Sequence, residues 1–180
     1  MSTLKVTNIE HGSTTDGGIQ LDNSGHVTID GQQMPTAGPL SNRNLIINGA
    51  MNVAQRGTSS TANGYGSVDR WHIQWDGGTV THTQTAITSG SPYDEGFRNV
   101  LRLTNTATGS GAGHYRNPFQ YIEAQNLAQS GWNYTSSSSY VTLSFWVRSS
   151  VAQEFFGYLR TFDGTAQSYS FSTGTLSANT

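Results

Sequence analysis

Residues 141–147 constrain the fold of this chain most strongly, because apolar and polar side chains alternate along them without interruption. The two sets are Val141, Leu143, Phe145 and Val147 on one side, and Thr142, Ser144 and Trp146 on the other. Successive side chains of a β-strand point to opposite faces of its sheet, so this alternation predicts a strand with one face in a core. We expect Trp146, on the other face, to pack under a loop or against another subunit.

Other segments show strand-forming patterns and are separated by turns rich in Gly, Ser and Asn. The predicted strands lie at residues 44–48, 69–76, 78–86, 98–105, 114–123, 140–148, 155–162 and 167–173. Short helices are expected near residues 50–56 and 122–129. Many short strands between turn signals are typical of a sandwich or jelly roll. We therefore predict an all-β chain with an antiparallel jelly-roll β-sandwich over residues 43–180.

Residues 1–34 are predicted to form a separate segment of short strands. Its apolar positions are Leu4, Val6 and Ile9, then Ile19 and Leu21, then Val27 and Ile29. Strands this short bury too little apolar surface to be stable alone, so we expect them to pack against other copies or a partner. Pro35 and Pro39 mark residues 35–42 as a linker, because proline cannot donate to a strand ladder and stiffens an extended connection.

Charged residues make up only 11% of the chain, and the net charge is -2. This balance gives no basic surface for nucleic acid or anionic lipid. The abundant neutral polar residues suit viral fibres and extracellular β-proteins better than a cytosolic enzyme. The chain has no cysteine, which excludes disulfides and cysteine-based sites. We expect no membrane insertion and no secretion signal, because no apolar run approaches the roughly 20 residues of a membrane span.

Catalytic and nucleotide-binding motifs are missing from the sequence. The glycine-rich residues 109–113 lie between two predicted strands, where we expect a hairpin loop rather than an anion site. Glycosidases need two carboxylates, for which Asp94 with Glu95, or Glu123 with Glu154, are candidates. With eleven acidic residues in the chain, we expect chance proximity rather than a catalytic pair. We therefore predict no enzymatic activity and no cofactor.

No metal site is predicted from the five histidines, because no two of them have a spacing that forces them together. His72 and His82 flank Gly77 and Gly78, so they can become cross-strand neighbours in a hairpin about that turn. We expect such a pair to be neutral and to lie on the sheet surface.

Aromatic side chains are the best candidates for a binding site, because flat rings stack on the apolar face of a sugar. The candidate glycan contacts are Tyr65, Trp75, Tyr115 and Trp132. We expect Tyr65 and Trp132 to be exposed in loops. Trp71 and Trp75 lie four residues apart, and one of them is expected in the core. The alternative is that these rings cover the sandwich rims or a subunit contact.

Residues 43–71 read RNLIINGAMNVAQRGTSSTANGYGSVDRW. This order of motifs resembles the start of a jelly-roll module found in tail-fibre and other tail proteins of bacterial viruses. The motif residues are Asn48, Gly49, Arg56, Asp69, Arg70 and Trp71. For Asp69 and Arg70 we expect an ion pair or a turn cap rather than ligand contact.

Residues 120–123, 127–128 and 141–149 resemble a later block of the same family, whose sandwiches are similar to carbohydrate-binding modules. Such jelly rolls often hold a structural calcium, but the stretch after Gly49 lacks an acidic residue. Members usually continue with further strands, so we expect either a shortened fibre or a sandwich that is incomplete at its C-terminus.

Residues 1–31 resemble the N-terminal ends of tail-fibre proteins of marine bacterial viruses. The resemblance implies a protein made in the host cytoplasm and assembled into the virion tail as a homotrimer. Residues 1–34 would attach to other tail proteins of adaptor, nozzle or baseplate type, and the jelly roll would adhere to host-surface glycans. The alternative is a purely structural connector that never binds a receptor.

Overall fold

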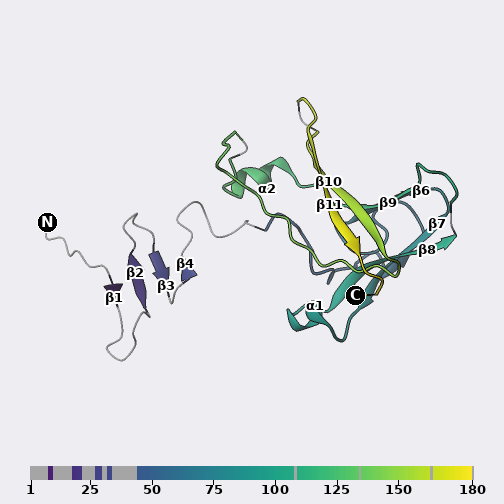
Figure 1. The fold of residues 1–180 in the computed structure, drawn as a ribbon, viewed down its shortest axis with the longest axis horizontal. Helices are drawn as coiled ribbons and strands as arrows, with labels where there is room; N and C mark the ends of the chain where they lie inside the picture. Colours follow the sequence, from purple (N-terminus) through teal and green to yellow (C-terminus); the bar gives the residue numbers. More distant parts are fainter. Residues whose placement is uncertain are drawn as a thin grey trace. The chain divides into compact units, whose positions relative to one another are not determined.

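The computed structural model describes residues 8–9, 18–21, 27–29, 32–33, 44–107, 109–133, 135–162 and 164–179. Within them the chain is mostly β, as predicted, with small antiparallel sheets (Figure 1). The helices are short: α1 (Ser91–Asp94) and α2 (Ala124–Gln129). No helix of this described part has the length and apolar character needed to traverse a bilayer. The chain divides into two compact units, residues 1–141 and 142–180.

An amphipathic sheet lies near the N-terminus. Its strands, in spatial order, are β1 (Asn8–Ile9), β2 (Ile19–Leu21), β3 (Val27–Ile29) and β4 (Gln32–Gln33). Ile19 lies opposite both Ile9 and Ile29, and opposed residues share a face, so three isoleucines form a row. All three are exposed. The strands predicted around these isoleucines are confirmed, whereas Leu4, Val6 and the predicted linker 35–42 lie outside the described residues.

Two sheets share the core of the larger body. One contains β5 (Ser59–Ser60), β7 (Thr79–Ala86) and β8 (Asn99–Ala107), and the other pairs β6 (His72–Asp76) with β9 (Tyr115–Phe119). Strand β7 lies within the strand predicted at 78–86. It buries Val80 and His82 while its threonines face the other way, so the expectation that His82 lies on the sheet surface is wrong. Ile73 of β6 is buried too, and the Trp75 ring lies 6.1 Å from the His82 ring. The core therefore forms where the inner faces of the two sheets meet.

The predicted hairpin about Gly77 and Gly78 is wrong, because β6 and β7 belong to different sheets. Both glycines have positive φ, 71° and 68°, and they turn the chain from one sheet into the other. His72 therefore lies opposite Phe119, whereas His82 is buried between Ser67 and Ala62. The loop at residues 109–113 is likewise a connection between sheets rather than a hairpin loop.

Two other predicted elements near residue 50 are also wrong. Residues 44–48 form a loop and turn instead of a strand, because the side-chain amide of Gln120 takes both the N–H and the carbonyl of Ile47, each at 2.8 Å. Residues 50–56 are not helical, since Met51 has a φ of 56°.

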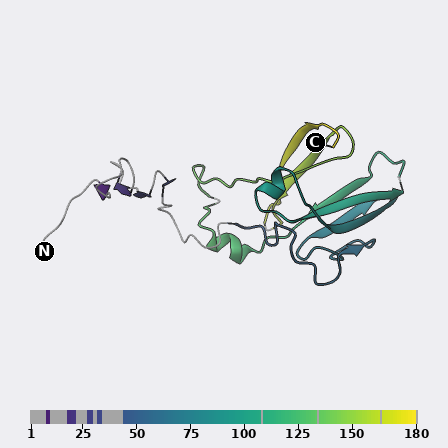
Figure 2. The same cartoon turned by 90° about the horizontal axis from the view of Figure 1, so that it is seen from below.

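The second unit is a hairpin of β10 (Gln153–Arg160) and β11 (Ser168–Leu176), close to the predicted strands (Figure 2). Gly157 lies opposite Phe171, and a Cβ at Gly157 would collide with that ring. The strand predicted at 140–148 is wrong, because β10 and β11 pair with each other and this segment joins no sheet. Its Phe145 ring lies 6.1 Å from the Phe171 ring, and Trp146 is exposed, so no loop of the described residues covers it. The other expectation for Trp146, a contact with another subunit, stays a prediction.

The side chain of Asn48 ties two distant loops together. Its Nδ2 donates to the carbonyl oxygens of Val53 and Asp69, both at 2.9 Å, and its Oδ1 accepts from the N–H of Val53. The Asn48 carbonyl accepts from Nε1 of Trp71 at 3.2 Å. Asn48 has a left-handed φ of 56°, which asparagine tolerates better than most residues. The N-G and D-R-W motifs are thus one hydrogen-bonded unit in space.

We expect Asn48→Gly to lower the free energy of unfolding by about 2–3 kcal/mol, because three side-chain hydrogen bonds of about 1 kcal/mol each are lost while glycine keeps the left-handed backbone. Urea denaturation measures the change. Asn44→Gly is the matched control, since Asn44 makes a local bond to Ile46 within the same loop. Equal stability of the two variants would contradict a tie through Asn48.

Candidate functional site

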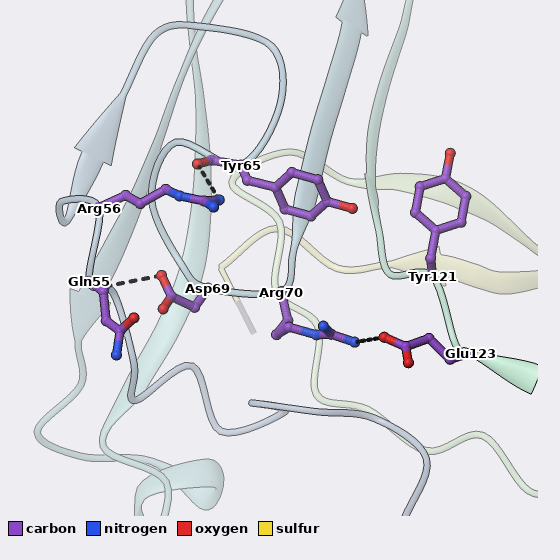
Figure 3. A pocket seen from close by; sticks show the side chains of 7 residues that line it. All are labelled: Gln55, Arg56, Tyr65, Asp69, Arg70, Tyr121 and Glu123. Atoms are coloured by element: carbon purple, nitrogen blue, oxygen red, sulfur yellow. Dashed lines mark hydrogen bonds and ion pairs between the residues drawn. The ribbon is translucent and has the colours of Figure 1, made fainter. Parts of the chain in front are cut away.

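Three loops meet at a groove of about 410 Å³, which we call the tyrosine groove (Figure 3). Its lining consists of Gln55, Arg56, Tyr65, Asp69, Arg70, Tyr121 and Glu123. The first two residues precede β5, the next three lie between β5 and β6, and the last two follow β9. The groove thus brings together residues of two separate motif blocks, 43–71 and 120–123.

Hydrogen bonds to backbone groups, most of them from side chains, fix the loops around the groove. Oδ1 of Asp69 accepts from the N–H of Gln55 at 3.0 Å, and the N–H of Asp69 donates to the carbonyl of Val53. The Gln120 amide holds the segment after β9 against Ile47. Asp69 therefore caps a loop, as predicted.

Opposite charges balance within the groove. Nη2 of Arg70 lies 3.3 Å from Oε1 of Glu123, which confirms the ion pair expected for Arg70, and both side chains are exposed. Oε2 of Glu123 accepts from Gln125 at 2.7 Å. The Arg56 guanidinium donates to the carbonyl of Tyr65 at 3.4 Å and lies 5.9 Å from the centre of that ring. Two arginines and two carboxylates leave the lining without net charge.

A row of rings connects the two tyrosines of the groove. Tyr65 contacts His72 edge-on at 4.9 Å, His72 lies 4.7 Å from Phe119, and Phe119 contacts Tyr121 at 5.1 Å. The tyrosines at the two ends are 39% and 52% exposed. In Figure 3 their rings stand on opposite sides of the gap, with the Arg70–Glu123 pair below them. Nδ1 of His72 is buried and has no hydrogen-bond partner among the described residues.

The backbone of Arg70 is strained. Arg70 is the third residue of a turn closed by the N–H of Trp71 and the carbonyl of Val68 at 3.3 Å. Its φ of 73° lies in the left-handed region, where a residue with a Cβ is disfavoured by roughly 1–2 kcal/mol. Strain of this kind is concentrated at functional sites.

No protein family, curated protein or solved structure matches this chain. The resemblance to viral tail fibres therefore stays a prediction.

Of the four predicted glycan contacts, only Tyr65 lines the groove. Trp75 is half-buried against His82 and thus contributes to the core. Tyr115 is exposed on β9 but outside the lining. The exposure predicted for Trp132 is wrong: the ring is half-buried, because its Nε1 donates to the carbonyl of Ser139 across the following loop.

Sequence reasoning missed Tyr121 and Glu123 as groove residues. The available signal was their place in the block of residues 120–123, beside Gln120. Of the motif residues, Arg56, Asp69 and Arg70 line the groove, whereas Asn48 and Trp71 hold its loops. Gly49 belongs to the turn that follows Ile47.

Two other candidate clusters offer no usable site. Within the described ranges no three His, Asp or Glu side chains gather closely enough to hold a metal ion. Oγ of Ser67 lies 2.6 Å from Nδ1 of His82, a spacing that a nucleophile and its base can have. Both residues are buried, and Nε2 of His82 donates to the carbonyl of Ala62, so the pair serves the core.

We expect Arg70→Gly to be more stable than Arg70→Ala by about 1 kcal/mol, because both variants lose the ion pair but only glycine relieves the left-handed strain. Thermal and urea unfolding of the two variants measure this difference. Loss of the exposed pair itself costs at most about 1 kcal/mol. A glycine variant that is less stable than the alanine variant would show that Arg70 is not strained.

Proposed function

We propose that this chain is a host-adhesion protein of a bacterial-virus tail fibre, and that the tyrosine groove binds a surface glycan. The observation that carries this proposal is the meeting of two distant motif blocks at one groove with two exposed tyrosine rings. Aromatic faces cover the apolar face of a sugar, while guanidinium and carboxylate groups bind its hydroxyls. The mechanism is binding without turnover.

A jelly-roll sandwich over residues 43–180 belongs to the same proposal. It is supported by the two sheets that share a core, β5–β7–β8 and β6–β9, and by their antiparallel pairing throughout. Loops at the rim of such a sandwich are ordinary places for a binding site, because a rigid scaffold positions them.

Assembly through the N-terminal sheet completes the proposal. The isoleucine row of β1, β2 and β3 is exposed, and a sheet this small needs an apolar partner. A homotrimer that covers the row and docks on a tail protein would provide one. Several grooves on one fibre raise avidity, so each contact can be weak.

The alternative function is a structural connector that binds only virion proteins. It is favoured by exposed apolar side chains in residues 142–180, among them Phe145, Trp146, Phe156 and Tyr169. Exposed apolar side chains of this kind are typical of a surface that another protein covers. A connector would leave the tyrosine groove without a glycan ligand.

The adhesion proposal predicts that the labelled full chain binds immobilised bacterial lipopolysaccharides or capsular polysaccharides, and that periodate treatment of the sugar abolishes binding. Tyr121→Ala should weaken binding about tenfold, equivalent to about 1.4 kcal/mol. Tyr158→Ala is the matched control, because Tyr158 and Tyr121 are both 52% exposed and Tyr158 lies outside the groove. Binding that survives periodate, or equal effects of both variants, would contradict a glycan site in the groove.

The assembly proposal predicts that the full chain is a trimer and that Ile19→Asp converts it to a monomer, because a carboxylate enters the apolar row. Multi-angle light scattering measures both masses. Gln20→Asp is the control, since the neighbouring residue of β2 points to the opposite face. A monomeric wild-type chain would exclude this interface.

A further inference from the structure

The charges of the tyrosine groove bear on which sugars it can hold. Arg70 is paired with Glu123, and Arg56 lies over the Tyr65 ring. Asp69 adds a second carboxylate, so no positive charge remains in excess. The whole chain carries a net charge of -2 and does not attract anions at long range.

Glu123 would oppose an acidic ligand directly. A carboxylate or sulfate that bound Arg70 would lie next to the Glu123 oxygen, which is only 3.3 Å from the guanidinium nitrogen. Like charges at such a distance cost binding energy. Sugar hydroxyls meet no such penalty, because one hydroxyl can accept from Arg70 while the adjacent hydroxyl donates to Glu123.

The rings of the groove suit an uncharged pyranose. Tyr65 contacts the His72 ring edge-on at 4.9 Å, and Tyr121 contacts the Phe119 ring edge-on at 5.1 Å. Side chains fixed in this way lose little conformational freedom on binding. Their exposed faces can cover the apolar face of a sugar, while the polar pair below them meets its hydroxyls.

We infer that the tyrosine groove selects neutral glycans, and that the Arg70–Glu123 pair binds two adjacent hydroxyl groups of one sugar. This inference rests on the proposed function. In this arrangement Glu123 contacts the ligand directly, and its carboxylate repels acidic sugars.

The test measures binding of the full chain to neutral polysaccharides (dextran, mannan, galactan) and to acidic ones (polygalacturonate, dextran sulfate) by biolayer interferometry. We expect a neutral polysaccharide to bind best, with affinity unchanged between low and high salt, because no charge is transferred into the groove. Glu123→Gln should weaken this binding at least fivefold. Glu95→Gln, an equal charge change outside the lining, should leave it unaltered.

We expect the fold to survive Glu123→Gln, because glutamine has nearly the same shape, the Glu123 side chain caps no N–H of α2, and its ion pair with Arg70 is exposed. Tighter binding of polygalacturonate, lost at high salt and strengthened by Glu123→Gln, would overturn the neutral-glycan inference but keep adhesion through the groove. Neutral binding unaffected by Glu123→Gln would overturn the role of the pair. Failure of every polysaccharide to bind would overturn the proposed function as well.

Discussion

The hydrogen bonds of the Asn48 side chain are the constraint on which the groove depends. They hold the loop before β5 against the turn before β6. Nε1 of Trp71 strengthens this contact by donating to the carbonyl of Asn48. Asp69 can then cap Gln55, and Arg70 is placed beside Glu123. A single amide thus decides where groove residues from separate loops come together.

This polar tie matters because little apolar surface is buried around it. Among the described residues, the fully buried apolar side chains are Val68, Ile73 and Val80, and His82 fills space beside them. Because the core is small, hydrophobic burial stabilises the sheets without fixing the loops. The loop positions are set by hydrogen bonds from side chains to the backbone. The geometry of the groove is therefore more sensitive to Asn48 and Gln120 than to any one residue of its lining.

Strand positions were largely predictable from the sequence, but their partners were not. The strands predicted at 78–86 and 98–105 match β7 and β8, which pair with each other along their length. Residues 141–147 alternate clearly but form no strand. Alternation predicts which side chains would share a face of a strand, but it does not show whether another strand is there to pair with it. At Ile47 the opposite occurs: a predicted strand residue has its backbone N–H and carbonyl bonded by the side chain of Gln120 instead of by a strand. The spacing of apolar residues in the sequence cannot predict such a contact.

The groove was predictable only in part for the same reason. Tyr65 stood out as an aromatic residue between glycines, whereas Tyr121 joins it only because β9 pairs with β6 and His72 lies opposite Phe119. The ring row is thus a product of sheet order. The left-handed backbone of Arg70 is disfavoured, yet it places a guanidinium beside Glu123 at a position where glycine would suit the turn better. A strained residue whose side chain lines the groove fits a role in binding better than a role in folding.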